Sequence, residues 1–161
     1  MIWPGAAKGQ GAGMIRRFGE SREPGRRYRR RRGVYAVLLR GDRVLLTHQA
    51  APVPEYQLPG GGVDAGETAL PALHREVWEE TGWSITPLRR LGAFRRLTYM
   101  PEYDLCAEKL CEIWLARPVR RLGPVPEPGH TALWLPPREA VARLGNDGDR
   151  HFLARVLRGQ L

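Results

Sequence analysis

The sequence predicts one α/β domain, and three observations support this class. The chain has 161 residues, which is enough for one domain with a proper core and too few for two comfortable ones. Short β-branched, apolar runs alternate with segments whose apolar residues recur at helical spacing. Proline and glycine clusters separate these segments. Strands with interspersed helices of this kind form a domain of two or three layers.

The first strands are expected to form a hairpin. Residues 34–39 and 44–48 are β-branched and apolar, and the turn residues 40–43 lie between them. Three prolines in residues 52–59 then predict a loop. Further strands are expected at residues 85–86, within 91–99, at 105–116 and at 132–135.

The first helix is expected over residues 69–81. Thr68 is the predicted N-cap, and Gly82 is the predicted C-terminal stop. The apolar residues expected to bury against the sheet are Leu70, Leu73 and Val77. Two further helices are expected, one from Pro136-Pro137 to Leu144 and one over 149–157.

Charge is distributed unevenly along the chain. Residues 1–32 carry ten Lys and Arg against two Glu, whereas residues 33–161 carry 16 Lys and Arg against 15 Asp and Glu. We therefore predict a basic, disordered or extended segment over 1–32, disordered at 1–13, and a folded domain over 33–161. The arginine-rich run 26–32 either grips nucleic acid or polyphosphate, or is a solvated lead-in to the first strand. The second interpretation is favoured.

Several classes of protein are excluded by composition. The longest clean apolar run, residues 34–39, is far too short to cross a bilayer. No apolar segment follows Arg16-Arg17, so a twin-arginine export signal is rejected. Cys106 and Cys111 show no metal-binding or redox spacing. We expect a cytoplasmic protein with reduced, packing cysteines and no membrane partner.

One spacing carries most of the functional information. Gly61 is followed after five residues by Glu67, and after seven more by the run Arg75-Glu76-Val77-Trp78-Glu79-Glu80-Thr81-Gly82. Seven positions of this template would meet by chance on the order of once in a million chains of this length. The spacing is the Nudix box, and the chain resembles the Nudix hydrolases.

The residue types in this segment suit phosphate and metal. The glycines of residues 60–62 let the backbone approach a ligand closely. Glu76, Glu79 and Glu80 are spaced i, i+3, i+4 and project from one helix face. They lie in the last turn, where the helix dipole disfavours negative charge, and a divalent cation would relieve that repulsion. Hard oxygen ligands suit Mg²⁺ or Mn²⁺.

The resemblance implies a Nudix-type α/β/α sandwich with a mixed β-sheet. It also implies metal-dependent hydrolysis of a nucleoside diphosphate linked to another group X, giving a nucleoside monophosphate and phosphorylated X. The implied metal ligands are Glu76, Glu79, Glu80 and the carbonyl of Gly60. Arg75 is implied to orient the acidic cluster, often through Glu67.

Other site residues are less tightly specified. The resemblance implies a general base that is either one of the box glutamates or a further glutamate outside the box. Outside the box the chain offers Glu108, Glu112 and Glu127, and Glu127 ranks first because it lies in a Pro/Gly loop. Substrate phosphate is expected to contact Gly61, Gly62 and Lys109. The box ends in Trp83 instead of an aliphatic residue, and Tyr56 replaces a common upstream Trp; Tyr56 is expected in the core.

Three functions stay open at this point. The favoured one is hydrolysis of a small nucleotide. Tyr99 and Pro101 resemble features of two different substrate classes, so together they do not identify the substrate. The second is an RNA 5′-end pyrophosphohydrolase that uses the basic N-terminal segment. The third is a non-catalytic nucleotide-sensing module, which has no need for a complete acidic triplet. Oligomeric state, preferred cation and physiological substrate are not specified.

Overall fold

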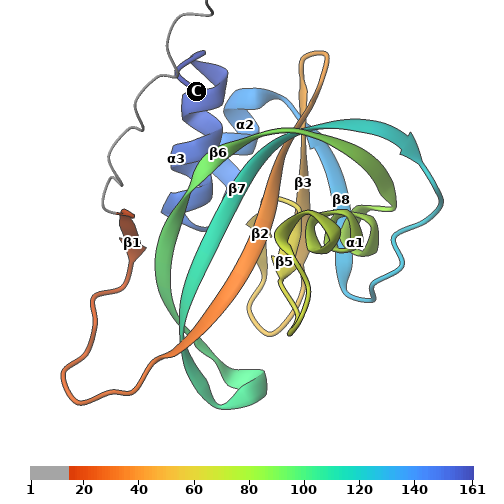
Figure 1. The fold of residues 1–161 in the computed structure, drawn as a ribbon. Coiled ribbons are helices and arrows are strands. Elements are labelled where there is room, and N and C mark those ends of the chain that lie inside the picture. Colours follow the sequence, from red (N-terminus) through yellow and green to blue (C-terminus); the bar gives the residue numbers. More distant parts are fainter. Residues whose placement is uncertain (1–14) are drawn as a thin grey trace, which may run out of the picture.

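The computed structural model describes residues 15–161, so the prediction of disorder for residues 1–13 lies outside the described residues. These residues form one curled, eight-stranded mixed sheet with three α-helices (Figure 1). The strands are β1 (Arg17–Gly19), β2 (Arg29–Arg40), β3 (Arg43–Gln49), β4 (Glu55–Gln57), β5 (Gly60–Gly62), β6 (Trp83–Met100), β7 (Leu105–Arg121) and β8 (His130–Leu135). The helices are α1 (Ala69–Thr81), α2 (Pro137–Arg143) and α3 (Asp147–Leu157), with a 3-10 turn η1 (Pro101–Tyr103).

The sheet is mixed, as predicted. Its main path runs β1-β6-β7-β2-β3-β4, while β5 pairs with β2 and β8 with β3. The β1–β6 and β2–β7 pairs are parallel, and the remaining pairs are antiparallel.

Helices cover the sheet on two sides (Figure 1). Alternation along β2 sends Val34, Ala36 and Leu38 into a buried cluster with residues of α1. The intervening Tyr35 and Val37 enter a second buried cluster, which includes residues of α2 and α3. The central strand is therefore buried on both faces, and α1 is held firmly against it.

The arginine run is part of the sheet. β2 begins at Arg29, four residues before the predicted domain start, because Arg29–Arg32 pair in register with Ala107–Leu110 of β7. Arg29–Arg32 are exposed to solvent, as the lead-in interpretation expects, but they belong to the strand itself and do not precede it. Upstream, the short strand β1 pairs with β6.

Other differences from the predicted elements come from pairing between distant residues. The two strands expected within residues 85–99 are one long strand, β6, interrupted only by register shifts against β7. The glycine segment 60–62 forms β5 by pairing with Gly33–Tyr35. Neither β4 nor β5 has the apolar alternation that marks a strand in sequence.

Helix α1 has the predicted bounds, and its C-terminal stop is confirmed. Gly82 adopts φ 75°, and a Cβ there would lie 2.5 Å from the carbonyl oxygen of Gly123. Thr68 occupies the N-cap position but makes no side-chain capping hydrogen bond. Leu73 and Val77 are buried as expected, whereas Leu70 in the first turn is 38% exposed, so its predicted burial is wrong. The buried cluster takes its helix residues from Ala72 onward.

Within the described part of the chain, no helix has both the length and the apolar character needed to cross a membrane. Both thiols are free. Cys111 is buried, and this burial raises its pKa to about 12, which suits a packing role.

Asp149 at the start of α3 makes stability depend on pH. Its carboxylate is buried and accepts a hydrogen bond of 3.0 Å from the backbone N–H of Leu58. Burial raises its pKa to about 6, whereas an unfolded Asp has a pKa of about 3.9. Between these values the folded chain holds a proton that the unfolded chain has lost, so stability falls as pH rises.

Substituting Asp149→Asn removes this titration and keeps an acceptor for Leu58. We expect the free energy of unfolding of the variant, relative to the unmodified protein, to rise by up to about 3 kcal/mol between pH 4 and pH 7. Urea denaturation across this range measures the difference. Asp42→Asn, in the exposed turn after β2, is the control and should show no such trend. Parallel pH curves for Asp149→Asn and the unmodified protein would contradict the assignment.

Candidate active site

The glycines of β5 bring the backbone against the acidic end of α1. The N–H of Gly60 donates a 3.1 Å hydrogen bond to Glu80 Oε2. A Cβ on Gly61 would lie 2.2 Å from Glu76 Oε2, so only glycine leaves room for that carboxylate. Gly60 itself has φ 148°, and a Cβ there would lie 2.1 Å from the carbonyl oxygen of Val34. This close approach places the predicted phosphate loop beside the predicted metal ligands.

Arg75 connects the acidic residues of the box. Its Nε and Nη2 donate to the two oxygens of Glu67 at 3.0 and 2.9 Å, a bidentate pair. Its Nη1 donates to Glu76 at 2.7 Å and to Glu79 at 3.2 Å. Nη2 also donates to the carbonyl of Gly62 at 3.0 Å. The structure thus brings Arg75 to Glu67 and to two of the three carboxylates that it is expected to orient.

Crowding and burial raise the pKa values of two carboxyl groups in the acidic cluster. Burial raises the pKa of Glu76 to about 7; Arg75 opposes this shift, and the neighbouring charges of Glu80 and Glu79 reinforce it. Burial also raises the pKa of Glu80, against hydrogen bonds from His130 and from the Gly60 N–H. Carboxylates with such raised pKa values are candidates for a functional site. A divalent cation would stabilise their ionised forms.

Glu127 joins this cluster from the loop between β7 and β8. Its backbone N–H donates to the carbonyl of Glu79 at 2.9 Å, which ties the loop to the end of α1. Single oxygens of Glu76, Glu79 and Glu127 lie within 4.8 Å of one another. Such a set of carboxylate oxygens fits a hard divalent cation.

The other two candidate bases, Glu108 and Glu112, contact residues outside the box. Glu108 forms ion pairs with Arg22 at 3.2 Å and Arg95 at 3.6 Å. Glu112 accepts a hydrogen bond of 2.7 Å from the indole of Trp114. Of the three candidates, therefore, Glu127 is the one that the structure brings to the box.

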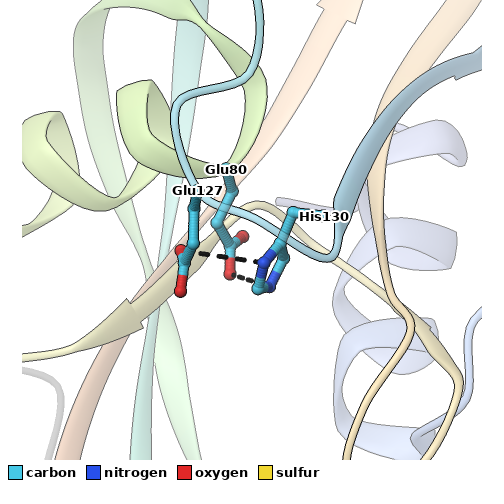
Figure 2. Close-up of side chains that lie close together, drawn as sticks. All are labelled: Glu80, Glu127 and His130. Atoms are coloured by element: carbon cyan, nitrogen blue, oxygen red, sulfur yellow. Dashed lines mark ion pairs between the residues drawn. The ribbon is translucent and has the colours of Figure 1, made fainter.

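His130, which the sequence analysis missed, completes the site. Figure 2 shows its imidazole facing the carboxylates of Glu80 and Glu127. Nε2 lies 3.2 Å from Glu80 Oε1, and Nδ1 lies 3.7 Å from Glu127 Oε2. The hydrogen bond to Glu80 raises the pKa of His130. The only signal in the sequence is its position three residues after Glu127, which is weak by itself.

A cavity of about 740 Å³ opens beside Glu127 and His130, large enough for a nucleotide. Its wall includes Lys109, one of the predicted phosphate contacts, and Arg96. Tyr56 packs against the buried core cluster, as expected, but it is only half-buried and also lines this cavity; its ring lies 4.5 Å from the His48 ring, centroid to centroid. Tyr99 and Pro101 line the same cavity.

The space at Gly61 yields a test of this geometry. Gly61→Ala would push the Glu76 carboxylate aside, and we expect turnover to fall about a hundredfold because misplaced ligands are costly. Stability should change little, because the atom displaced belongs to the end of a flexible side chain. Steady-state kinetics and thermal denaturation measure both effects. Gly123→Ala is the matched control, since a Cβ there meets nothing within 4 Å; equal loss in both variants would contradict the argument.

Comparison with known proteins identifies the family of this chain. The NUDIX domain family matches residues 29–156. A putative 8-oxo-dGTP diphosphatase of Bacillus subtilis is 34% identical over 73 residues, which cover 45% of this chain and 49% of that protein. An RNA pyrophosphohydrolase of Cereibacter sphaeroides is 41% identical over 64 residues, covering 40% and 38%. The matched segment thus spans half or less of these relatives.

Solved structures agree on the fold. A NUDIX hydrolase from Nitrosomonas europaea superposes with a TM-score of 0.65 at 21% identity, covering 82% of this chain and 91% of that one. A MutT protein from Methanosarcina mazei gives a TM-score of 0.61 at 21% identity, covering 82% and 96%. The α/β/α sandwich expected from the sequence is confirmed. With the box, the sheet and the family match over residues 29–156 in agreement, this chain belongs to the NUDIX family.

Proposed function

We propose that this protein is a pyrophosphohydrolase that cleaves a nucleoside diphosphate linked to another group, releasing a nucleoside monophosphate and phosphorylated X. The observation that carries the proposal is the convergence of Glu76, Glu79 and Glu127 within 4.8 Å, beside the nucleotide-sized cavity. The relatives' names include a diphosphatase and a pyrophosphohydrolase. Both names denote cleavage of phosphoric anhydrides.

Each part of the site has a physical task in this reaction. Glu76, Glu79 and Glu80, the ligands that the resemblance implies, would hold divalent cations, Mg²⁺ or Mn²⁺, with the Gly60 carbonyl as a further ligand. Glu127 lies beside them, since one of its oxygens is within 4.8 Å of oxygens of Glu76 and Glu79. When bound, such a cation neutralises charge on the pyrophosphate oxygens and lowers the pKa of an attacking water. Lys109 and Arg96 in the cavity wall would attract the substrate phosphates.

The general base is assigned to Glu127. Its side chain is 42% exposed, more than that of Glu80 at 6%, so it can reach a water at the cavity edge. The cavity also presents Tyr56 and Tyr99, whose rings offer flat surfaces to a nucleobase.

A panel of nucleotides assayed with Mg²⁺ and with Mn²⁺, with products separated, tests this function. We expect cation-dependent turnover of at least one nucleoside diphosphate derivative, and the products identify the bond that breaks. Cation binding without turnover of any nucleotide or RNA 5′ end would instead favour a nucleotide-sensing module.

A second candidate, hydrolysis at RNA 5′ ends, is favoured by the arginines of β2. Among the described residues, Arg29–Arg32 form no ion pair, although a rigid strand holds them. Arg30 and Arg32 line a cavity of about 420 Å³ together with Gly62 and Glu67 of the box. Arg31 lies 5.4 Å above the ring of Tyr103. Unpaired arginines interleaved with an aromatic ring suit a single strand.

The double substitution Arg30→Ala, Arg32→Ala separates the two candidates. If RNA is the substrate, RNA affinity should fall and its salt dependence should weaken by about 1.4 in log–log slope, while turnover of small nucleotides is retained. Arg117→Ala, Arg120→Ala near the far end of β7 removes the same charge and is the control. Equal RNA affinity in both double variants would exclude this use of the β2 arginines.

A further inference from the structure

A further cavity lies where β1, β6 and α3 meet, at the edge of the sheet that lies away from α1 (Figure 1). Its volume is about 540 Å³, which is within the range of small-molecule sites. It shares no lining residue with the cavity beside Glu127 and His130. It is therefore a separate place in the fold from the acidic site.

The wall of this cavity is basic and contains no carboxylate. Arg16, Arg90, His151 and Arg155 line it, and the other lining residues are apolar or glycine. The two cavities described above both have carboxylates in their walls. A concave wall with positive charge alone attracts an anion.

Two of these arginines have no counter-charge. Arg90 forms an ion pair with Glu112 at 3.4 Å. Arg16 and Arg155 form no ion pair with any of the described residues. The segment 1–14 contains no Asp or Glu, so its side chains cannot neutralise them either. The charges of Arg16 and Arg155 are therefore available to a bound anion.

Aromatic contacts hold the basic groups of this wall in place. The guanidinium carbon of Arg16 lies 4.9 Å from the centroid of the Phe18 ring. The His151 ring lies against both Phe18 and Phe152, with centroid distances of 5.3 and 5.4 Å. Groups that are positioned before binding lose less conformational entropy when a ligand arrives.

His151 adds a group that can take up a proton. Burial lowers its pKa, and the positive charges of Arg16, Arg155 and Arg158 lower it further. An anion bound among these groups would act in the opposite direction, because it stabilises the imidazolium. Binding of an anion and protonation of His151 should therefore favour each other.

We propose that this cavity binds a phosphate group, free or as the monoester of a small molecule, with Arg16 and Arg155 holding its oxygens and His151 donating a hydrogen bond to it. The planar fork of arginine matches phosphate oxygens. A phosphate monoester has a second pKa of about 6, so at neutral pH it is mostly a dianion, which suits two unpaired arginines. This binding does not depend on which reaction the acidic site performs.

An NMR titration of the full chain, with Mg²⁺ present, tests the proposal through the ring C–H signals of the four histidines. The probes are inorganic phosphate, a nucleoside monophosphate, a sugar phosphate and a short RNA with a 5′ phosphate, and the uncharged nucleoside is the negative control. We expect a saturable shift of the His151 signal, which is identified by its loss in His151→Gln, and a higher pKa of His151 in the saturated complex. A shift with inorganic phosphate alone would assign the cavity to free phosphate. Tighter binding of a small ester would show that the rest of that molecule also contacts the wall.

The double substitution Arg16→Gln, Arg155→Gln keeps His151 as the probe. It should weaken binding at least about tenfold and remove the rise in the pKa of His151 on addition of the probe. Arg117→Gln, Arg120→Gln near the far end of β7 removes the same charge and should bind like the unmodified protein. No saturable shift with any probe, equal loss in both double variants, or a response only to the RNA overturns the proposal. These readouts need no turnover, so failure of this binding and failure of the proposed reaction are distinguished.

Discussion

Replacing Glu79 by Gln is expected to lower turnover at least about a hundredfold, with little loss of stability. The Glu79 carboxylate lies within 4.8 Å of those of Glu76 and Glu127. Losing one charged ligand weakens the binding of the cation that stabilises the transition state. Each factor of ten in rate corresponds to about 1.4 kcal/mol of activation free energy. Its side chain is 33% exposed and Gln has nearly the same size, so the fold should be retained.

Steady-state kinetics at several Mg²⁺ concentrations, together with calorimetric titration of the cation, measures this effect. We expect weaker cation binding along with the lower turnover. Glu20→Gln, an exposed residue of the segment after β1, is the control for loss of one negative charge. If Glu79→Gln turns over substrate at the unmodified rate, the carboxylate cluster of Glu76, Glu79 and Glu127 has no part in the mechanism.

Arg75→Lys is expected to lower turnover about tenfold, although it preserves the charge. An ammonium group cannot reproduce the planar fork that binds both oxygens of Glu67 while a third nitrogen contacts Glu76 and Glu79. The acidic side chains then lose their common partner, and their mutual repulsion increases. Because Arg75 acts through these residues, raising the Mg²⁺ concentration should recover part of the lost rate.

Turnover measured against Mg²⁺ concentration distinguishes this positioning role from contact with the substrate. Arg90→Lys is a matched control, since Arg90 approaches Glu112 at 3.4 Å outside the site and its side chain is 50% exposed. It should leave the cation dependence unchanged. A tenfold loss in Arg75→Lys that Mg²⁺ does not relieve would argue that Arg75 contacts substrate instead.

The acidic helix was predictable because its signals are local. The i, i+3, i+4 spacing of Glu76, Glu79 and Glu80 places them on one face wherever the helix lies. Gly82 ends the helix by adopting a left-handed conformation that depends on its own backbone. The pairing of Arg75 with Glu67 rests on the resemblance to the Nudix box, which encodes a contact between residues eight positions apart.

Contacts between distant segments were harder to predict. Arg29–Arg32 have the composition of a solvated terminus, yet they form a strand because β7 offers backbone partners about 80 residues later. Tyr56 has the apolar ring of a core residue, and on the short strand β4 it both packs against the core cluster and lines the cavity. Neither outcome follows from composition or from hydrophobic period.

By itself, the sequence determined the family, the helix that carries the box, and the residues of the glycine loop, because each depends on short-range spacing and on backbone chemistry. The tertiary structure alone decided that His130 joins Glu80 and Glu127, and that Glu127 lies beside Glu76 and Glu79. The reason is geometric. The loop before β8 meets α1 only after the sheet has formed, so no periodicity in the chain records how far apart these side chains lie.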